Sequence, residues 1–407
     1  MKTELPMEGG FVYVDKTMLI DELLSNRSEV VLFTRPRRFG KTLNMSMLRY
    51  FFDITERERS AALFRGLNIE NSPHYARRGA SPVIFLTLKD LKSPTWAGML
   101  AKLNIKIAIL CEQYQILAPN LEGRTARFFE DALNAKLDTD RLALSLQMLS
   151  QILCTHYEEK TIILIDEYDA PLLDAYEFGY YDEAITFFRV FLGSALKTNP
   201  HLGFAVLTGI LRVSKESLFS GLNNVRVCSI IDYQFVDKFG FTDSEVEALH
   251  NTQSERLKMA PMISMQGMRM WYDGYSFGNN IKQLEIYNPW SVLCALSTLQ
   301  LKAHWVNTSQ DMLINIVLKK HIDTALPIIE KLINGESIPI QLNESAVLKS
   351  MQENATLDEL WSLLFFSGDL TLATPPDSRN LCDVRMPNME IRDSYRNTLQ
   401  SIIETGA

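Results

Sequence analysis

An α/β fold with a parallel sheet flanked by helices is the fold class that the sequence predicts. Short apolar runs occur at Val30–Phe33, Val83–Leu86, Thr161–Ile165 and Phe204–Leu207. Runs this short, and this rich in β-branched residues, are typical of strands that are buried on both faces. Segments with a helical pattern separate them, and strands that alternate with helices indicate a parallel sheet.

The elements around these strands follow from the same patterns. A short strand at Phe11–Val14 and a helix at Lys16–Leu24 precede the first buried strand. After that strand and a polar loop, a helix begins at Lys41, because apolar residues then recur at helical spacing. Longer helices are expected at Trp96–Gln115, Thr139–Tyr157 and Tyr181–Thr198.

The pattern changes after about Gly240, where most segments are typical of helices. We therefore expect two domains, 1–240 with the sheet and 241–407 with mainly helices, because 407 residues are too many for one ordinary domain. Elements near the end of the sequence suit a winged-helix-like module. They are a helix at Leu357–Phe366, a hairpin of Leu370–Ala373 and Leu381–Met386, and a helix at Glu390–Ile403.

The composition limits the class of protein. Hydrophobic residues make up 46% and charged residues 22%, which are ordinary globular values. A net charge of −8 disfavours a protein that coats nucleic acid. The five cysteines are isolated, so we expect neither a disulfide framework nor a zinc site. Neither a signal peptide nor an apolar run of the ~18 residues of a membrane helix is evident, which favours a cytoplasmic protein without a membrane segment.

The polar loop after the first buried strand is similar to the phosphate-binding pattern GxxxxGK[ST]. Gly40, Lys41 and Thr42 match its last three positions, whereas Arg35 replaces its first glycine and Pro36 must set the turn in another way. With a strand before it and a helix after it, such a loop directs backbone N–H groups at phosphates. Lys41 is then expected at the β- and γ-phosphates, and Thr42 at a magnesium ion. The alternative is an arginine-rich surface loop that caps a helix.

The third buried strand ends in two carboxylates, Asp166 and Glu167. Open α/β sheets place ligands at the carboxyl ends of their strands, which is where these side chains are expected. Asp166 is predicted to hold magnesium, and Glu167 to polarise an attacking water molecule. Asp169 lies close by in the sequence, and it is either a partner of these groups or the cap of the next helix.

Seven segments together resemble the bacterial AAA-ATPase-like family. They are Phe11–Thr17, Arg35–Thr42, Ile165–Pro171, Thr208–Arg212, Leu218–Asn224, Tyr272–Tyr275 and Tyr287–Ser291. The resemblance implies that 1–240 is a P-loop ATPase core of the AAA/STAND type, in which arginine is usual at the position of Arg35. It also implies that Asp15 and Lys16 lie near the nucleotide entrance. Many members have a PD-(D/E)XK nuclease-like domain after this core, which we do not expect in this sequence.

The fourth buried strand ends at Thr208-Gly209. In ATPases of the AAA type a polar residue at this place lies between the acidic strand end and the γ-phosphate, which makes Thr208 the candidate sensor. A threonine that simply ends a strand is the alternative. Arg212 follows closely, either to contact the γ-phosphate or a neighbouring subunit as an arginine finger, or as a solvated side chain.

The sequence therefore predicts an ATP-binding, Mg²⁺-dependent ATP hydrolase that couples hydrolysis to a conformational change. The predicted nucleotide-binding residues are Arg37, Arg38, Phe39, Gly40, Lys41 and Thr42; Thr42 and Asp166 are the metal ligands; Glu167, Thr208 and Arg212 are the catalytic residues. Two alternatives are a slow nucleotide-dependent signalling switch and a DNA-associated module of a nuclease or defence-type system. ATP or ADP and an unidentified protein are the expected partners, and the net charge does not favour nucleic acid.

Overall fold

The chain divides into two compact units. The computed structural model describes residues 13–197, 199–211, 218, 224–257, 263–305, 324–344 and 356–405. The first unit comprises Met1–Phe33, Lys41–Val227 and Val347–Lys349, and the second comprises Thr34–Gly40, Cys228–Ala346 and Ser350–Ala407. The loop Thr34–Gly40 thus belongs to the second unit, although both of its neighbours in the sequence belong to the first.

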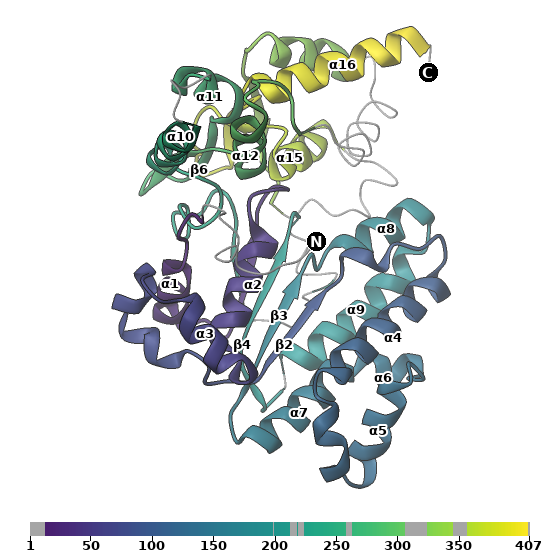
Figure 1. The fold of residues 1–407 in the computed structure, drawn as a ribbon. Helices are drawn as coiled ribbons and strands as arrows, with labels where there is room; N and C mark the ends of the chain where they lie inside the picture. Colours follow the sequence, from purple (N-terminus) through teal and green to yellow (C-terminus); the bar gives the residue numbers. More distant parts are fainter. Residues whose placement is uncertain are drawn as a thin grey trace. The chain divides into compact units, whose positions relative to one another are not determined.

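A five-stranded sheet forms the centre of the first unit (Figure 1). Its order is β2-β3-β4-β1-β5, with β1 at Val30–Thr34, β2 at Val83–Thr87, β3 at Thr161–Asp166, β4 at Leu202–Gly209 and β5 at Val225–Cys228. β3 pairs in parallel with β2 on one side and with β4 on the other. Because β4 lies between β1 and β3, its carboxyl end lies between the carboxyl ends of those two strands. The predicted α/β class with a parallel sheet is confirmed.

Helices cover both faces of this sheet. In Figure 1, α2 (Lys41–Phe52) lies on one side of β2, β3 and β4, and α4 (Trp96–Glu112), α7 (Ser145–Tyr157) and α9 (Tyr181–Leu196) lie on the other. Every residue of β1 and β3 is buried, which is why these strands appear in the sequence as unbroken apolar runs.

The remaining helices of the first unit are short. The α-helices are α1 at Met18–Asn26, α3 at Arg57–Leu63, α5 at Gly123–Leu133, α6 at Thr139–Ala143 and α8 at Ala170–Phe178; 3₁₀ turns lie at Ile54–Glu56, Asn68–Asn71, Pro73–Arg77, Lys89–Leu91 and Gln115–Asn120. The strand predicted at Phe11–Val14 falls partly outside the described residues, and its described part is not a strand.

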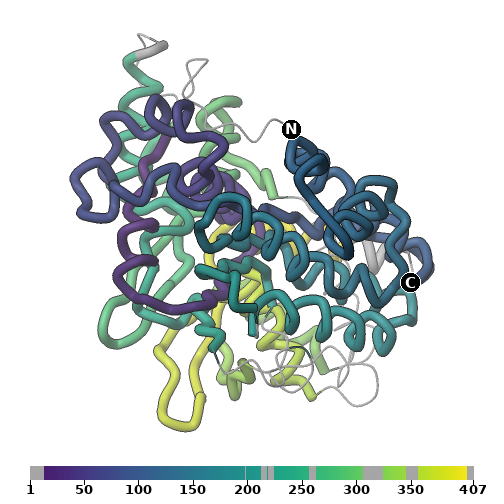
Figure 2. Tube along the Cα trace, turned by 90° about the horizontal axis from the view of Figure 1, so that it is seen from below, coloured from purple at the N-terminus to yellow at the C-terminus, as the bar shows by residue number. Residues whose placement is uncertain are grey.

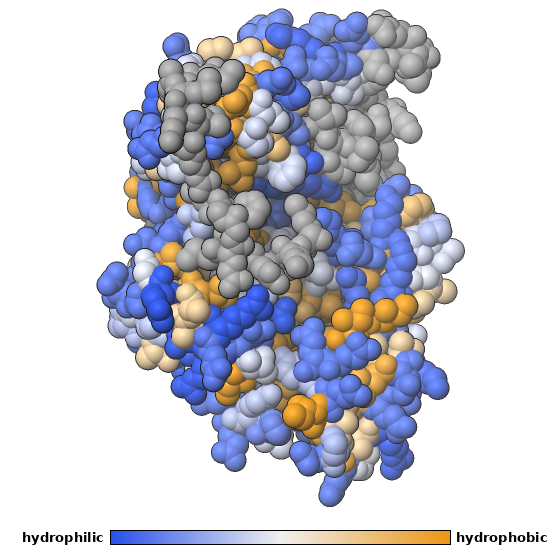
Figure 3. Space-filling view, viewed as in Figure 1, coloured by the Kyte–Doolittle hydropathy of each residue, from blue (hydrophilic) through white to orange (hydrophobic). Residues whose placement is uncertain are grey.

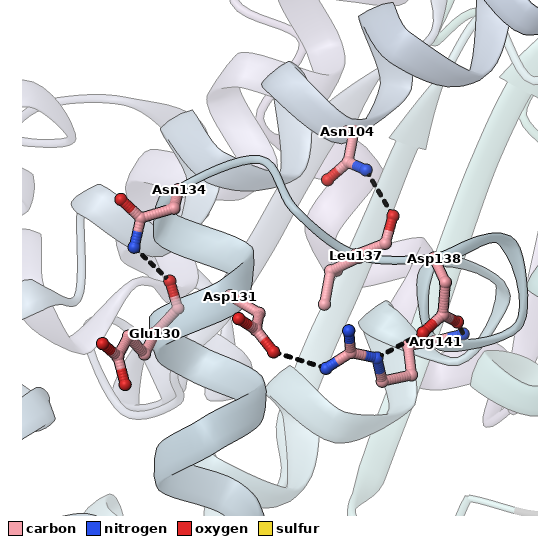
Figure 4. A network of polar contacts seen from close by, with 7 residues as sticks. All are labelled: Asn104, Glu130, Asp131, Asn134, Leu137, Asp138 and Arg141. Carbon is pink, nitrogen blue, oxygen red and sulfur yellow. Dashed lines mark hydrogen bonds and ion pairs between the residues drawn. The ribbon is translucent and has the colours of Figure 1, made fainter.

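The helix predicted over Thr139–Tyr157 is two helices, α6 and α7. A polar network lies at the start of α6 and joins it to α5 (Figure 4). Asp138 caps α6 by accepting the N–H of Arg141 at 2.9 Å, and the Arg141 guanidinium reaches back to Asp138 and to Asp131 of α5. α6 ends at Ala143, Leu144 has a φ of −99° and a ψ of 1°, and α7 starts at Ser145.

Some apolar side chains of the first unit face outward. Ile105 and Ile109 of α4 are each 53% exposed, and Val190 of α9 is 49% exposed. Figure 3 shows orange patches on the right of the view, where Figure 1 places α4 and α9. Single exposed apolar residues are normal in globular proteins, and these do not alter the assignment of the core.

The second unit is mainly helical with two small antiparallel sheets. The strands are β6 (Tyr275–Gly278) paired with β7 (Gln283–Ile286), and the sheet of β8 (Ile338–Gln341), β10 (Leu381–Arg385) and β9 (Thr371–Leu372). The helices include α10 (Asp243–Leu257), α11 (Met265–Tyr272), α12 (Pro289–Thr298), α15 (Leu357–Ser367) and α16 (Met389–Thr405), and residues 324–333 are also helical. Figure 2 traces these elements in green to yellow.

The end of the second unit contains the elements that the sequence predicts there. α15 and α16 match the two predicted helices, and β9 and β10 pair in the predicted antiparallel hairpin. The capping box of Thr356 and Glu359 starts α15, and Gly368, with φ of 96°, ends it. A winged-helix arrangement of these elements stays a prediction.

Candidate active site

The candidate site begins where the phosphate loop meets α2. Gly40 has a backbone φ of 82°, a value that residues with a Cβ rarely adopt. There would be room for a side chain, because a Cβ at this position would meet nothing within 4 Å. Glycine is thus required by the backbone and not by space. Lys41, only 6% exposed, is the first residue of α2, so it lies at the helix N-terminus, the place where a phosphate is bound in such folds. This strand, loop and helix have the local order that phosphate binding requires.

Asp166 brings two hydroxyl groups together at the end of β3. Its Oδ2 accepts a hydrogen bond from the Thr42 hydroxyl at 2.7 Å, and its Oδ1 accepts one from the Thr208 hydroxyl. Asp166 is 1% exposed and Thr208 is fully buried. Three predicted site residues therefore meet at one carboxylate. Magnesium prefers oxygen ligands and usually takes one or two carboxylates together with substrate phosphates, so the Thr42 and Asp166 oxygens fit this ion.

Glu167 follows directly and has an unusual backbone conformation. Its φ of 53° lies in the left-handed region, which residues other than glycine rarely adopt. Burial raises the pKa of its carboxyl group, the neighbouring Asp166 raises it further, and the charges of Lys41 and Lys89 lower it. A carboxylate with a raised pKa at a strand end is the kind of group that acts as a general base.

The Asp169 carboxylate binds backbone N–H groups next to the site. The sequence left its role open, and no side-chain capping hydrogen bond is found at its position before α8. Its Oδ2 accepts the N–H groups of Ile210 at 2.9 Å and Leu211 at 2.8 Å. Burial raises the pKa of this carboxyl group. Asp169 therefore connects the end of β3 to the segment that follows β4, which fixes Thr208 relative to Asp166.

Two residues next to the site were not singled out from the sequence. The Tyr168 hydroxyl donates to the carbonyl of Leu211 at 2.7 Å. A Cβ on Gly209 would lie 2.6 Å from the Tyr168 ring and 2.7 Å from the Asp169 carboxylate. The sequence shows that a glycine follows Thr208, but it does not show why a glycine is needed. The reason is the close approach of Gly209 to Tyr168 and Asp169, which depends on the pairing of β3 with β4.

Gly209→Ala is expected to destabilise the protein by about 1–3 kcal/mol, the usual cost of forcing atoms into a packed interior. The Tyr168 ring and the Asp169 carboxylate are both held by hydrogen bonds, so neither yields easily. Gly193→Ala in α9 is the matched control, since its Cβ meets nothing within 4 Å. Alanine in a helix interior should stabilise by about 0.5–1 kcal/mol. Denaturant midpoints measure both changes, and equal midpoints for the two variants would contradict the expectation.

The other predicted site residues lie in the second unit or outside the described residues. Arg38 is half-buried, and its guanidinium lies 5.2 Å from the centre of the Trp290 ring. Phe39 is 1% exposed, so only its backbone is available to a ligand. Arg37 is half-buried. Arg212 lies outside the described residues, and its predicted role stays a prediction.

Asp15, which the resemblance places near the nucleotide entrance, has a structural task. Its Oδ1 accepts the N–H of Thr17 at 2.8 Å, and its Oδ2 accepts the N–H of Asn68 at 2.7 Å. These contacts fix the start of α1 to a 3₁₀ turn. Lys16 is 9% exposed. The implied place of both residues at the nucleotide stays a prediction.

Comparison with known proteins identifies the family. A curated relative, "Uncharacterized protein in vnfD 5'region" of Azotobacter chroococcum mcd 1, is 26% identical over 397 residues, which cover 96% of this chain. The chain spans 66% of the length of that relative, just under two thirds. No helix among the described residues is long and apolar enough to cross a membrane. A family model described as "Predicted AAA-ATPase" matches residues 4–219, more than half of the chain, and the protein belongs to this AAA-ATPase-like family.

Proposed function

We propose that the protein is a Mg²⁺-dependent ATPase that couples hydrolysis of ATP to a conformational change. The observation that supports this most directly is the Asp166 carboxylate, which accepts both the Thr42 and the Thr208 hydroxyls beside the buried Lys41. A phosphate-loop hydroxyl and a carboxylate at the end of another strand of the sheet are the two protein ligands that a P-loop enzyme gives to magnesium. We propose the domains 1–240 and 241–407 as the ATPase core and its helical companion.

Each side chain then has a distinct task. Lys41 binds the β- and γ-phosphates with its ammonium group, and the N-terminus of α2 adds backbone N–H groups. Thr42 and Asp166 hold the metal, which when bound neutralises charge that develops on the phosphates. Glu167 takes a proton from the attacking water, and Thr208 keeps the Asp166 carboxylate oriented. ATP is abundant in the cytoplasm, where we place the protein.

Asp166→Asn is expected to weaken Mg²⁺-dependent ATP binding by about tenfold or more, the lower end of what a lost metal-site partner costs. Asparagine keeps the shape and one oxygen acceptor for the two hydroxyls but has no charge for the metal. Calorimetric titration with and without Mg²⁺ measures the effect, which should be small when the metal is absent.

The matched control for Asp166→Asn makes the same charge change at Asp140, an exposed residue in the first turn of α6. Asp140→Asn should leave the Mg²⁺ dependence as in the wild type. If Asp166→Asn also retains the full gain in affinity on adding Mg²⁺, the proposed metal site is wrong.

A slow nucleotide-dependent switch is the second candidate. It is favoured by the membership of the phosphate loop in the second unit, because a switch must pass the state of its nucleotide to another part of the chain. Steady-state turnover separates the two. Enzymes typically turn over at about 1–10³ s⁻¹, whereas signalling GTPases without a partner work on the order of 10⁻² s⁻¹ or below. The same assay with added DNA tests a DNA-associated function.

A further inference from the structure

Arg35, the residue that replaces the first glycine of the phosphate-loop pattern, is fully buried in the second unit. Its Nη1 donates to the carbonyls of Thr34 at 2.9 Å and Cys228 at 2.8 Å. The guanidinium also lies 5.0 Å from the centre of the Phe239 ring and 5.6 Å from that of Phe277. An arginine that binds carbonyls and aromatic faces in this way is an anchor, and it is not available to a phosphate.

Phe39, at the other end of the loop, is anchored in the same place. Its ring centre lies 4.9 Å from that of Tyr275 and 5.3 Å from that of Phe277, so it shares Phe277 with Arg35. Its carbonyl accepts the N–H of Gly240 at 3.2 Å. The residue just before Gly40 is therefore fixed by β6 and by the segment before α10.

Arg38 is held by a third set of contacts. It has a φ of 66°, stacks on Trp290 of α12 and donates to the carbonyl of His304 at 3.2 Å. The N–H groups of His304 and Trp305 both donate at 2.8 Å to Glu390, the second residue of α16. Burial lowers the pKa of Arg38, and the Glu390 charge opposes this effect. The left-handed backbone at residue 38 is thus maintained by side-chain contacts to α12 and the turn that α16 holds.

Three anchors, Arg35, Arg38 and Phe39, fix the loop before any nucleotide binds. Ordering a residue costs about 1–2 kcal/mol of conformational entropy, and a loop that is already ordered avoids this cost when it binds a ligand. An ordinary phosphate loop derives its conformation from glycine at the first position, whereas this one derives it from β6, α12 and the segments around them. We propose that the remainder of the second unit sets the nucleotide affinity of the phosphate loop, with Arg35 as the positioning residue. The inference rests on the proposed ATP binding.

Trp290 offers the cleanest test, because it is 40% exposed and has no part in the predicted phosphate contacts. Trp290→Ala should raise the Kd and KM for ATP about two- to fivefold, the size of an exposed cation–π contact. The kcat at saturating ATP should stay unchanged, because the Arg38–Trp290 contact stabilises the complex with ATP and the transition state equally. Trp290→Phe, which keeps an aromatic face, should restore most of the affinity. Leu293→Ala on the same helix, at a residue 43% exposed, should have no effect.

Arg35→Lys is the second variant, and it should raise the Kd further. Lysine has no second nitrogen to replace Nη2, which donates to the carbonyl of Phe235 at 3.5 Å, and no planar group to lie over the aromatic rings. Hydrogen exchange without nucleotide measures the anchoring itself, and the amides of residues 34–40 should exchange faster in both variants. A wild type that binds ATP, with variants that bind equally well or exchange equally slowly, overturns the inference and leaves the proposed function intact. A wild type that does not bind ATP overturns both.

Discussion

Lys41→Ala is expected to lower the affinity for ATP about 10- to 100-fold. A hydrogen bond to a charged group contributes about 1.5–3 kcal/mol, and alanine cannot replace the ammonium group at the phosphates. Lys41 is 6% exposed, so solvent screens its charge little. Calorimetric titration of the folded variant with Mg²⁺-ATP measures the loss directly.

Lys89→Ala is the control for Lys41→Ala. Lys89 is exposed, and its charge also lowers the pKa of Glu167, so the control removes a second positive charge that acts on the same carboxylate. Its effect on ATP affinity should be less than about threefold, the range of surface charge interactions. Equal affinities of the Lys41→Ala variant and the wild type would exclude the loop as the phosphate site.

Glu167→Gln is expected to keep ATP binding and to reduce the hydrolysis rate about 10²- to 10⁴-fold, the usual loss when a general base is removed. Glutamine has nearly the same shape, so the contacts of Asp166 with Thr42 and Thr208 should survive. Single-turnover hydrolysis beside a binding titration measures the two effects separately. Asp169 is a poor substitute for the lost base, because its Oδ2 already accepts two backbone N–H groups.

The pH profile provides an independent readout for the same residue. A base works only when it is ionised, so the rate should fall as the pH falls through the pKa of Glu167. Burial and Asp166 raise that pKa in the absence of metal, and the Glu167→Gln variant should lose this fall of the rate with pH. Glu159→Gln, at an exposed position, should keep the wild-type profile. A wild-type rate in the Glu167→Gln variant would show that another group takes the proton.

The strands and the phosphate loop were predictable because their signals are local. β1 and β3 are buried on both faces, and this condition alone produces the unbroken apolar runs. The break between α6 and α7 was missed, because the apolar pattern is continuous across Leu144, the residue at which the backbone leaves the helical conformation.

Long-range contacts also explain why parts of the candidate site could not be predicted. The choice between two roles for Asp169 depends on the amides of Ile210 and Leu211, which β4 brings close. Arg35 was recognisable as a departure from the phosphate-loop pattern, but its acceptor on Cys228 is 193 residues further along the chain. No periodicity or spacing in the sequence relates two positions so far apart.

The buried guanidinium of Arg35 predicts how this position varies over evolution. A relative that kept the phosphate loop but lost the segment 228–277 would leave this charge without the Cys228 carbonyl and without both aromatic neighbours. A buried charge without partners is strongly destabilising. Glycine at position 35 avoids that penalty and permits the turn on its own. The residue at this single position should therefore serve as a marker, readable from sequence alone, of whether a homologue possesses the second unit.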